Sequence, residues 1–260
     1  ALHLSIIYSM KHNYDFWNNK LPKGFYDDIF RQGKSNNASL QSSWHNLTFL
    51  KIKDYVDESF NLLDYACGPG TFTGNYTNCN SIGFDISPNQ IDYANEKYKS
   101  SRNIFTTSKS DILERGPFDI ITVLGLIEFL SVDEFKKELK FLLDNLKPDG
   151  KILFTTPNYA GLMFVLEKVS QLFNSVSYND VKETNYTSKK VKKLMKNTFS
   201  ELNLNYKIKK ILNFGIIMSI INNSFGIKLE QFIEKVFVNK IGFLLLIEIT
   251  QNDYQTPNEN

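Results

Sequence analysis

Apolar runs of strand length alternate with segments of helical periodicity from residue 60 to residue 157. Phe118–Leu124 is a nearly continuous apolar and β-branched run, as is typical of a strand covered on both faces. Between such runs, apolar residues recur three and four positions apart, as they do along one face of a helix. The alternation predicts an α/β fold with a parallel sheet built by right-handed crossovers. The strands expected here are 60–65, 81–85, 103–107, 118–124 and 151–156.

Capping residues mark where two of the intervening helices begin. Ser87-Pro88 supplies an N-cap and a proline at the first helical position, which predicts a helix to about Lys99. Ser131-Val-Asp-Glu134 has the form of a capping box. It predicts a helix that runs to Leu146 and is closed by Pro148-Asp-Gly150.

Residues 1–56 are expected to form an N-terminal arm and lid helices, ahead of a main domain that spans residues 57–260. Phe16 and Trp17 suggest an arm that packs on another part of the chain. A short helix is expected over 24–32, with a loop from Gly33. From Ser39 to Val56, apolar residues recur at roughly helical spacing and predict a helix that leads into the first strand.

The pattern changes after Pro157. Tyr159–Phe173 is apolar almost all round, so this predicted helix is either deeply buried or faces an apolar ligand. Further on, residues 215–239 form an apolar, helix-like insertion where a tight hairpin would suffice. Two final strands are expected on either side of it, at 202–214 and 241–250.

The second half of this insertion is amphipathic. Most such helices pack their apolar face on their own core. The alternatives are an apolar ligand pocket and a surface that lies against a membrane or a partner. The apolar positions are Ile227, Leu229, Phe232, Ile233, Val236 and Phe237, with Lys228, Glu230, Glu234 and Lys235 opposite.

Composition narrows the classes of function. With 260 residues, 42% of them hydrophobic and 22% charged, the chain can bury one substantial core. The net charge of +2 gives no reason to expect nucleic acid as a partner. The lysine-rich run 189–196 is expected to be the solvated face of a helix, the alternative being contact with an anionic surface or substrate. Two cysteines, Cys67 and Cys79, favour a reducing compartment over a disulfide scaffold.

No secretory signal stands at the start of the sequence. The longest apolar runs, around Ile211–Ile221 and Ile241–Ile249, reach about half of the roughly 20 residues that a membrane span needs. We therefore expect a cytoplasmic protein with no transmembrane segment, while peripheral contact with a membrane stays open.

Asp64-Tyr-Ala-Cys-Gly68-Pro-Gly70 joins the first strand to a helix that opens at Thr71. Gly68 and Gly70 allow the backbone to bend sharply and to approach a ligand without a Cβ in the way. A dinucleotide-binding loop needs a third glycine at position 73, where this chain has a threonine. A loop that holds adenosine and an amino acid, with no pyrophosphate to seat, can do without that glycine.

Asp85 ends the second strand, fifteen residues after Gly70. A carboxylate there can accept hydrogen bonds from both ribose hydroxyls of an adenosine. The alternative is an acid that caps the next helix. Asp85 alone does not show whether the cofactor is NAD or another adenosine compound, because all of them present a ribose diol.

These stretches resemble the class I S-adenosylmethionine-dependent methyltransferases. Asn61–Gly70 resembles motif I of that family, and Phe118–Leu130 resembles motif IV and the segment after it. The resemblance implies a Rossmann-like, seven-stranded methyltransferase sheet in the order 3-2-1-4-5-7-6, with strand 7 antiparallel and helices on both faces. It also implies S-adenosylmethionine as the cofactor.

The same resemblance implies which residues hold the cofactor. Asp111 would bind the adenine amino group, the alternative being a helix N-cap, and Asp64 would anchor the loop near the cofactor's cationic amino group. The backbone at Leu124 and Gly125 would flank the methionine part. The cofactor-binding residues expected are Trp44, Asp64, Ala66, Gly68, Gly70, Asp85, Ile86, Asp111, Ile112, Leu124 and Gly125.

Within class I, the closer likeness is to the O-methyltransferases of ubiquinone biosynthesis and related uncharacterised bacterial methyltransferases. It covers roughly residues 40–160 well. Relatives usually carry Glu-His where this chain has Glu128-Phe129, so the role of that histidine is lost or moved here. The likeness is carried by Leu126-Ile-Glu128-Phe129-Leu130, Leu146-Lys-Pro-Asp-Gly150 and Phe154-Thr-Thr-Pro157-Asn158.

His45 and Glu128 are the candidate catalytic residues. His45 lies on the helix expected to cover the cofactor, where it would contact the methionine carboxylate or act as a base. A lone histidine on an amphipathic helix is more often packed or solvated. The alternative for Glu128 is an acid beside the start of a helix. No zinc-ligand spacing, Ser-His-Asp order or phosphate-binding loop is present in the sequence, so we expect no metal.

The chain is therefore expected to move the methyl group of S-adenosylmethionine to a small-molecule or lipid-like acceptor, by O-methylation. In-line displacement at the sulfonium carbon needs mainly a nucleophile held about 3 Å from the methyl group with water excluded. Few catalytic side chains are then required. Two alternatives stay open: an NAD-dependent oxidoreductase, and a non-catalytic binding module that retains the fold.

Overall fold

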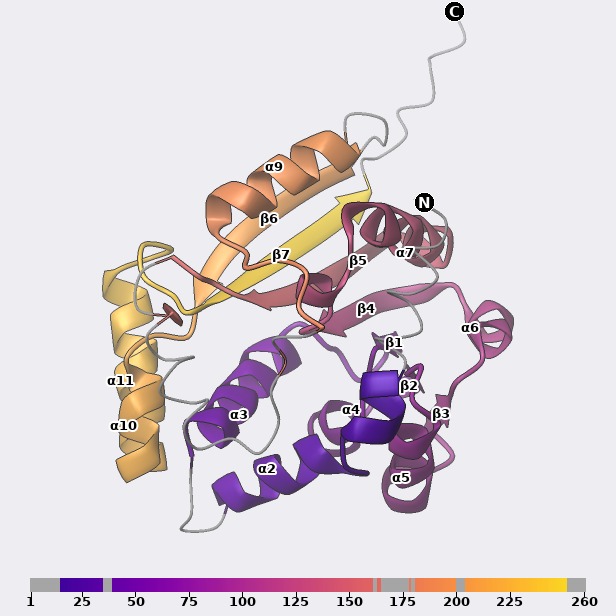
Figure 1. Cartoon of the computed structure of the whole chain (residues 1–260), viewed down its shortest axis with the longest axis horizontal. Coiled ribbons are helices and arrows are strands. Elements are labelled where there is room, and N and C mark those ends of the chain that lie inside the picture. The colour runs from indigo at the N-terminus through magenta and orange to yellow at the C-terminus, as the bar shows by residue number, and fades with distance from the viewer. Residues whose placement is uncertain are drawn as a thin grey trace, which may run out of the picture.

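The computed structural model describes residues 15–34, 39–160, 163–164, 178, 181–199 and 204–251. Within them, the chain forms a seven-stranded sheet in the order β3-β2-β1-β4-β5-β7-β6, with helices on both faces (Figure 1). This order confirms the predicted α/β, Rossmann-like fold. The strands are β1 (Asn61–Tyr65), β2 (Asn80–Phe84), β3 (Asn103–Thr106), β4 (Phe118–Leu124), β5 (Leu146–Pro157), β6 (Leu204–Ile211) and β7 (Leu244–Gln251).

Strands β1 to β5 pair in parallel, whereas β7 is antiparallel to both β5 and β6, as predicted. On β1, Leu63 lies opposite Ile82 of β2 and Ile121 of β4. The carboxyl ends of β1, β2 and β4 therefore meet at one edge of the sheet. From β1 the chain adds β2 and β3 on one side, and it then crosses to add β4 and β5 on the other. Open α/β sheets bind ligands at such a switch point.

Both faces of the sheet are covered. Ile120, Ile121 and Val123 on β4 have no exposed surface, which explains why that strand reads as a nearly continuous apolar run. Helices α6 (Lys109–Arg115), α7 (Val132–Asp144) and α9 (Ser188–Phe199) contribute to the core on one face. Helices α2 (Phe25–Lys34), α3 (Leu40–Lys53), α4 (Thr71–Tyr76) and α10 (Gly215–Ile221) contribute to the core on the other. Helix α5 (Pro88–Tyr98) packs on β3 through Ile91 and Ala94.

The capping box that opens α7 is confirmed, but this helix ends earlier than predicted. The Ser131 side chain accepts from the backbone N–H of Glu134, and the Glu134 carboxylate accepts from that of Ser131. The helix ends at Asp144 and not at Leu146, because Leu146 already pairs with Phe118 of β4. The sequence predicted that Leu146 ends the helix, but this residue belongs to strand β5. The two last strands are also shorter than predicted, and β6 stops before Leu212, whose φ is +58°.

The N-terminal arm packs on the sheet's edge helices, as expected from its aromatic residues. It forms a short helix, η1 (Phe16–Lys20), in which Phe16 is buried. The Ser87 hydroxyl donates to the Trp17 carbonyl, and the Asn89 amide donates to that of Asn18, so α5 holds the arm in place. Helix α2 continues through Gly33, where the sequence suggested a loop.

The insertion between β6 and β7 is helical, as predicted, and forms α10 and α11 (Asn223–Val236). The packing of α11 differs from that expected for an amphipathic helix, whose apolar face usually packs on the core. Phe232 and Val236 are 63% and 54% exposed, whereas Glu230 is 1% exposed. Phe232 and Val236 thus point away from the protein's core, whereas Ile227 of the same helix packs against it.

Across the described residues, no helix is both long and apolar enough to cross a membrane. The helix predicted at 159–173 lies mostly outside the described residues. The domain division at residues 56 and 57 and the cytoplasmic location stay predictions.

Candidate active site

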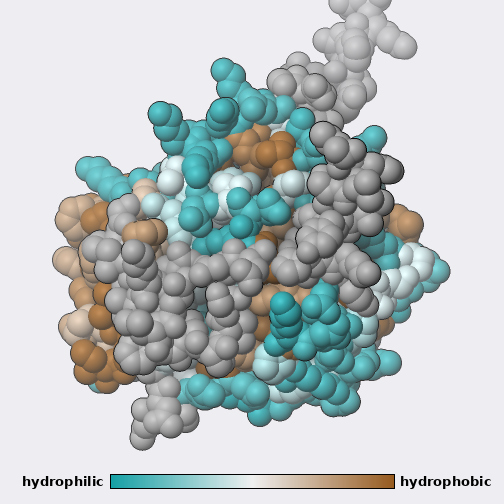
Figure 2. All heavy atoms as spheres, in the orientation of Figure 1, coloured by the Kyte–Doolittle hydropathy of each residue, from teal (hydrophilic) through white to brown (hydrophobic). Residues whose placement is uncertain are grey.

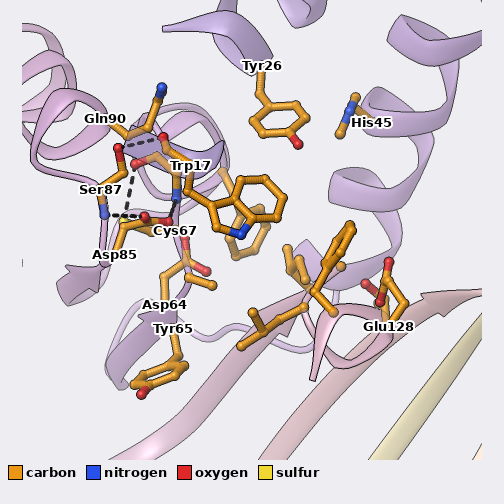
Figure 3. Close-up of a pocket in the computed structure, with 18 of the residues that line it drawn as sticks. Trp17, Tyr26, His45, Asp64, Tyr65, Cys67, Asp85, Ser87, Gln90 and Glu128 are labelled. Atoms are coloured by element: carbon orange, nitrogen blue, oxygen red, sulfur yellow. Dashed lines mark hydrogen bonds between the residues drawn. The ribbon is translucent and has the colours of Figure 1, made fainter. Parts of the chain in front are cut away.

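A pocket of about 890 Å³ lies at the carboxyl edge of the sheet, beyond the ends of β1, β2 and β4. The loops that follow these strands line it on one side. The N-terminal arm and α3 line it on the other, through residues such as Trp17, Tyr26, Trp44 and His45 (Figure 3). Segments far apart in the sequence therefore enclose one cavity at the switch point of the sheet.

The loop after β1 turns through three left-handed residues: Ala66 (φ +62°), Gly68 (φ +54°) and Gly70 (φ +74°). A Cβ added to Gly68 would meet only the Tyr26 ring, at 3.7 Å, so this glycine opens the loop toward the pocket. A Cβ on Gly70 would approach the Phe105 ring to 2.6 Å, so this glycine serves the packing of the loop on the sheet. Ala66 and Gly68 line the pocket, and Gly70 lies behind them.

Asp64 is buried at the end of β1 and anchors that loop. Its carboxylate accepts hydrogen bonds from the hydroxyls of Thr73, at 2.8 Å, and Thr122, at 2.8 Å. Burial raises the pKa of Asp64 to about 6. Thr73 stands where a dinucleotide-binding loop has its third glycine, and its hydroxyl ties α4 to the strand instead.

Asp85 follows β2 and accepts hydrogen bonds from two backbone segments at the pocket wall. Its two oxygens accept from the N–H groups of Gly68 and Ser87, each at 2.9 Å. Burial raises the pKa of this carboxyl. A carboxylate has about four lone-pair sites, so two remain for a ligand that enters the pocket. The side chain of the next residue, Ile86, lines the same wall and is 47% exposed.

Aromatic side chains from the arm, α2, η2 and the segment before α9 line the opposite part of the pocket. The Trp17 ring packs edge-on against Phe129 at 5.0 Å and near Tyr178 at 6.2 Å. The hydroxyls of Tyr26 and Tyr178 are 3.0 Å apart and share a hydrogen bond. His45 packs against the Tyr26 ring, and burial lowers its pKa to about 4, so it is neutral near pH 7.

Glu128 lies beneath this aromatic cover, in the short helix η2 (Ile127–Phe129) after β4. It is 4% exposed, and neither its Oε2 nor the nearby Thr156 hydroxyl finds a hydrogen-bond partner among the described residues. Burial raises the pKa of Glu128 to about 7. In Figure 3, Asp85 and Glu128 lie at opposite sides of the view, with the Trp17 indole between them.

Three predicted site residues do not line the pocket: Gly70, which lies behind the loop's lining residues, and Asp111 and Ile112. The Asp111 carboxylate turns back to accept from the Thr106 hydroxyl at 2.6 Å, and Ile112 is fully buried in the core beneath α6. Thr107 and Lys109 line the pocket in their place. Trp44, Leu124 and Gly125 line it as expected.

Sequence reasoning missed the aromatic cover: Trp17, Tyr26, Phe129 and Tyr178 did not enter the predicted site. The aromatic arm was a signal that something packs there, but no local pattern links residue 17 to residue 178. Across the described residues, no group of three or more histidine, cysteine or acidic side chains is arranged to hold a metal.

Sequence comparison places the chain in a family. A family model described as a methyltransferase domain matches residues 29–205, which is more than half of the chain. No curated protein matches the chain by sequence.

Solved structures share its fold at low sequence identity. Magnesium protoporphyrin IX methyltransferase from Synechocystis PCC 6803, solved with bound SAH, is similar with a TM-score of 0.58 and 13% identity, over 92% of this chain and 97% of that one. A plantazolicin methyltransferase, also with SAH, has a TM-score of 0.54 and 16% identity, over 97% and 100%. The small RNA methyltransferase HEN1 has a TM-score of 0.55 and 16% identity, over 80% and 25%. At these identities the likeness shows the fold.

Proposed function

The chain belongs to the methyltransferase domain family and is an S-adenosylmethionine-dependent enzyme, and on this premise we propose that it methylates an oxygen atom of a small-molecule or lipid-like acceptor. When bound, S-adenosylmethionine supplies a methyl group on a sulfonium, open to in-line displacement. The chain's residues have three tasks: to hold the cofactor, to orient the acceptor and to exclude water. Family membership leaves no support for the NAD-dependent oxidoreductase or the non-catalytic module.

The pocket wall around Asp85 fits the nucleoside end of this cofactor. Gly68 leaves the wall free of a Cβ, and Asp85 keeps lone pairs for the two ribose hydroxyls. Asp64 anchors the loop and would lie toward the cofactor's cationic amino group. We place Leu124 and Gly125 beside the methionine part, and Trp44 over it. Gly70, Asp111 and Ile112 are left out of the direct contacts, because none of them lines the pocket.

Glu128 carries the proposal for the acceptor. A buried carboxyl with an unpartnered oxygen, at the side of the cavity opposite Asp85, suits an acceptor that presents a hydrogen-bond donor. Its pKa of about 7 also suits a base that takes a hydroxyl proton near neutral pH. His45, with a pKa of about 4, is a much weaker base, and we give it a packing role beside Tyr26.

The aromatic cover supports an apolar or aromatic body for the acceptor. Trp17, Phe129 and Tyr178 contact one another and line the same pocket as Glu128. Phe129 stands where ubiquinone-type relatives have histidine. We infer an acceptor with a hydroxyl on a ring or next to an apolar tail. The magnesium protoporphyrin IX and plantazolicin methyltransferases, which have similar folds, agree with an organic acceptor, although the RNA enzyme shows that the fold alone does not determine it.

The test is product analysis with S-adenosylmethionine labelled in its methyl group. Acceptors would be offered in sets that differ only in the nucleophile, namely a phenol, an aniline and a thiophenol, each with and without a prenyl tail. The proposal expects labelled methyl ether from the phenols, and about 100-fold lower kcat in Glu128→Gln. A labelled methylamine or thioether as the main product would overturn it.

A further inference from the structure

Helix α11 turns its apolar face outward. Phe225, Leu229, Phe232 and Val236 follow one another at three- and four-residue spacing and form one stripe. Phe225, Phe232 and Val236 are each more than half exposed, and Ile221, at the end of α10, is 78% exposed. Figure 2 shows brown, hydrophobic atoms along the side of the molecule that α10 and α11 occupy in Figure 1. The stripe is therefore part of a larger apolar surface.

The inward face of the same helix carries two acidic residues beside Ile227, which packs on the core. Glu230 and Glu234 both bind the Lys51 ammonium on α3, with 3.0 Å between Lys51 and Glu230. Helices α10 and α11 meet through small residues, since a Cβ on Gly226 would reach the Ser219 backbone at 2.4 Å. Apart from Ile227, the inward contacts use polar and small residues while apolar residues lie outside, which is the reverse of the usual surface helix in water. Helices that face lipid use small residues at their contacts in the same way.

Positive charge flanks the stripe. Lys228 and Lys235 of α11 are exposed beside it, and Lys240 follows the helix. None of the three has an ion-pair partner among the described residues, whereas both acids of the helix are taken up by Lys51. The outward surface thus combines apolar side chains with cations and presents little negative charge.

We propose that α10 and α11 form a docking hairpin that lies in the interface of a membrane with anionic lipids. Exposed apolar residues with lysines beside them match acyl chains below and anionic headgroups above. A second copy of the chain fits less well, because a symmetric contact would bring lysines toward lysines. The acceptor pocket does not use this surface, since none of its lining residues belongs to α10 or α11.

Docking of the hairpin on a membrane would affect the active-site pocket through α3. That helix holds the hairpin through Lys51 near its C-terminal end and lines the pocket through Trp44 and His45, nearer its N-terminal end. The proposal does not depend on which acceptor the pocket takes.

The experiment is flotation of the full chain with two kinds of vesicle: phosphatidylcholine alone, and phosphatidylcholine mixed with phosphatidylglycerol. The chain is expected to float with the mixed vesicles, more weakly with the neutral ones, and less as salt increases. Lys228→Gln with Lys235→Gln should weaken partitioning by roughly 30-fold. Phe232→Ser with Val236→Ser should weaken it by roughly tenfold or more.

Matched controls come from exposed residues elsewhere. Lys192→Gln with Lys193→Gln on α9 removes the same charge, and Leu113→Ser with Val132→Ser removes exposed apolar side chains of similar size. Both should change partitioning by less than about twofold. Failure of the wild-type chain to float overturns the proposal, as does equal loss in the controls. Self-association that Phe232→Ser abolishes, without flotation, would assign the surface to a second copy instead.

Discussion

Two buried carboxyls in the pocket differ in their partners, and this difference separates their roles. Asp64 accepts hydrogen bonds from two threonine hydroxyls, which favour its charged form and offset part of its burial. Glu128 has an oxygen without a hydrogen-bond partner among the described residues, and burial outweighs the interactions that lower its pKa, which is about 7. Asp64 therefore supports the loop, and Glu128 is left available to a ligand.

Glu128 should make folding stability depend on pH. An ordinary glutamate has a pKa near 4.5 and releases its proton at lower pH than Glu128 does in the folded chain, where its pKa is about 7. Below pH 4.5 the carboxyl is protonated in both the folded and the unfolded chain, so it does not change stability. As pH rises from 4.5 to 7, the carboxyl ionises more readily in the unfolded chain, and the free energy of unfolding falls progressively. Glu128→Gln removes this cost, and should raise the free energy of unfolding by roughly 1–3 kcal/mol at about pH 8 and little at about pH 4. Urea denaturation at both pH values measures it.

The exposed Glu183→Gln is the matched control and should shift stability by less than about 0.5 kcal/mol at either pH. Equal effects of Glu128→Gln at the two pH values would contradict the assignment of a raised pKa.

The two glycines of the loop should respond differently to alanine. Both have positive φ, so each substitution costs about 1–2 kcal/mol of backbone strain. Gly70→Ala adds overlap with the Phe105 ring, about 1–3 kcal/mol more, whereas Gly68→Ala meets only open space and Tyr26. Urea denaturation should therefore show the larger loss for Gly70→Ala. Equal losses would mean that Gly70 is not packed on Phe105.

The sequence could predict site residues that stand in a recognisable local pattern, such as a turn directly after a strand. Gly68 and Asp85 follow strands at recognisable turns, and the structure puts both at the pocket wall. Asp111 also follows a strand, but its carboxylate is satisfied by Thr106, five residues back, and so turns away from the pocket. Tyr178 and Trp17 meet only in the folded chain, which no local pattern can show.

At the scale of elements, α3 couples the pocket to the insertion. Sequence periodicity predicted α3 and α11 as helices, and both form. It did not predict which face of α11 is buried, because that depends on Lys51, which lies on a different helix far away in sequence. Pairing with this cation holds the acidic face inward and leaves the apolar stripe outside.

Lys51→Met tests this coupling. It leaves Glu230 buried without its cation, and burial then raises the pKa of that carboxyl further. The variant should lose on the order of 3 kcal/mol of stability at neutral pH. Hydrogen exchange should speed up in α11 before it does in the sheet. Lys53→Met, on the exposed side of the same helix, is the control and should change little. Unaltered exchange in α11 would contradict a tether at Lys51.

At the scale of the whole molecule, periodicity could predict strands and helices but not their order in space. The order β3-β2-β1-β4-β5-β7-β6 came from resemblance to a family and is confirmed by the structure. It places the ends of β1, β2 and β4 together, so that Asp64, Asp85 and Glu128 reach one pocket from three distant parts of the sequence. The cofactor and acceptor ends of the proposed site both follow from this order.

Calorimetry with S-adenosylhomocysteine tests the proposed cofactor site most directly. Asp85→Ala removes the two charge-assisted hydrogen bonds to the ribose, about 1.5–3 kcal/mol each, so its affinity should fall by roughly 100-fold or more. The controls are Asp92→Ala, an exposed acid on α5, and Asp111→Ala, which lies outside the pocket; both should stay within about threefold of wild type. Wild-type affinity in Asp85→Ala, or a loss in Asp111→Ala as large as in Asp85→Ala, would contradict the site described.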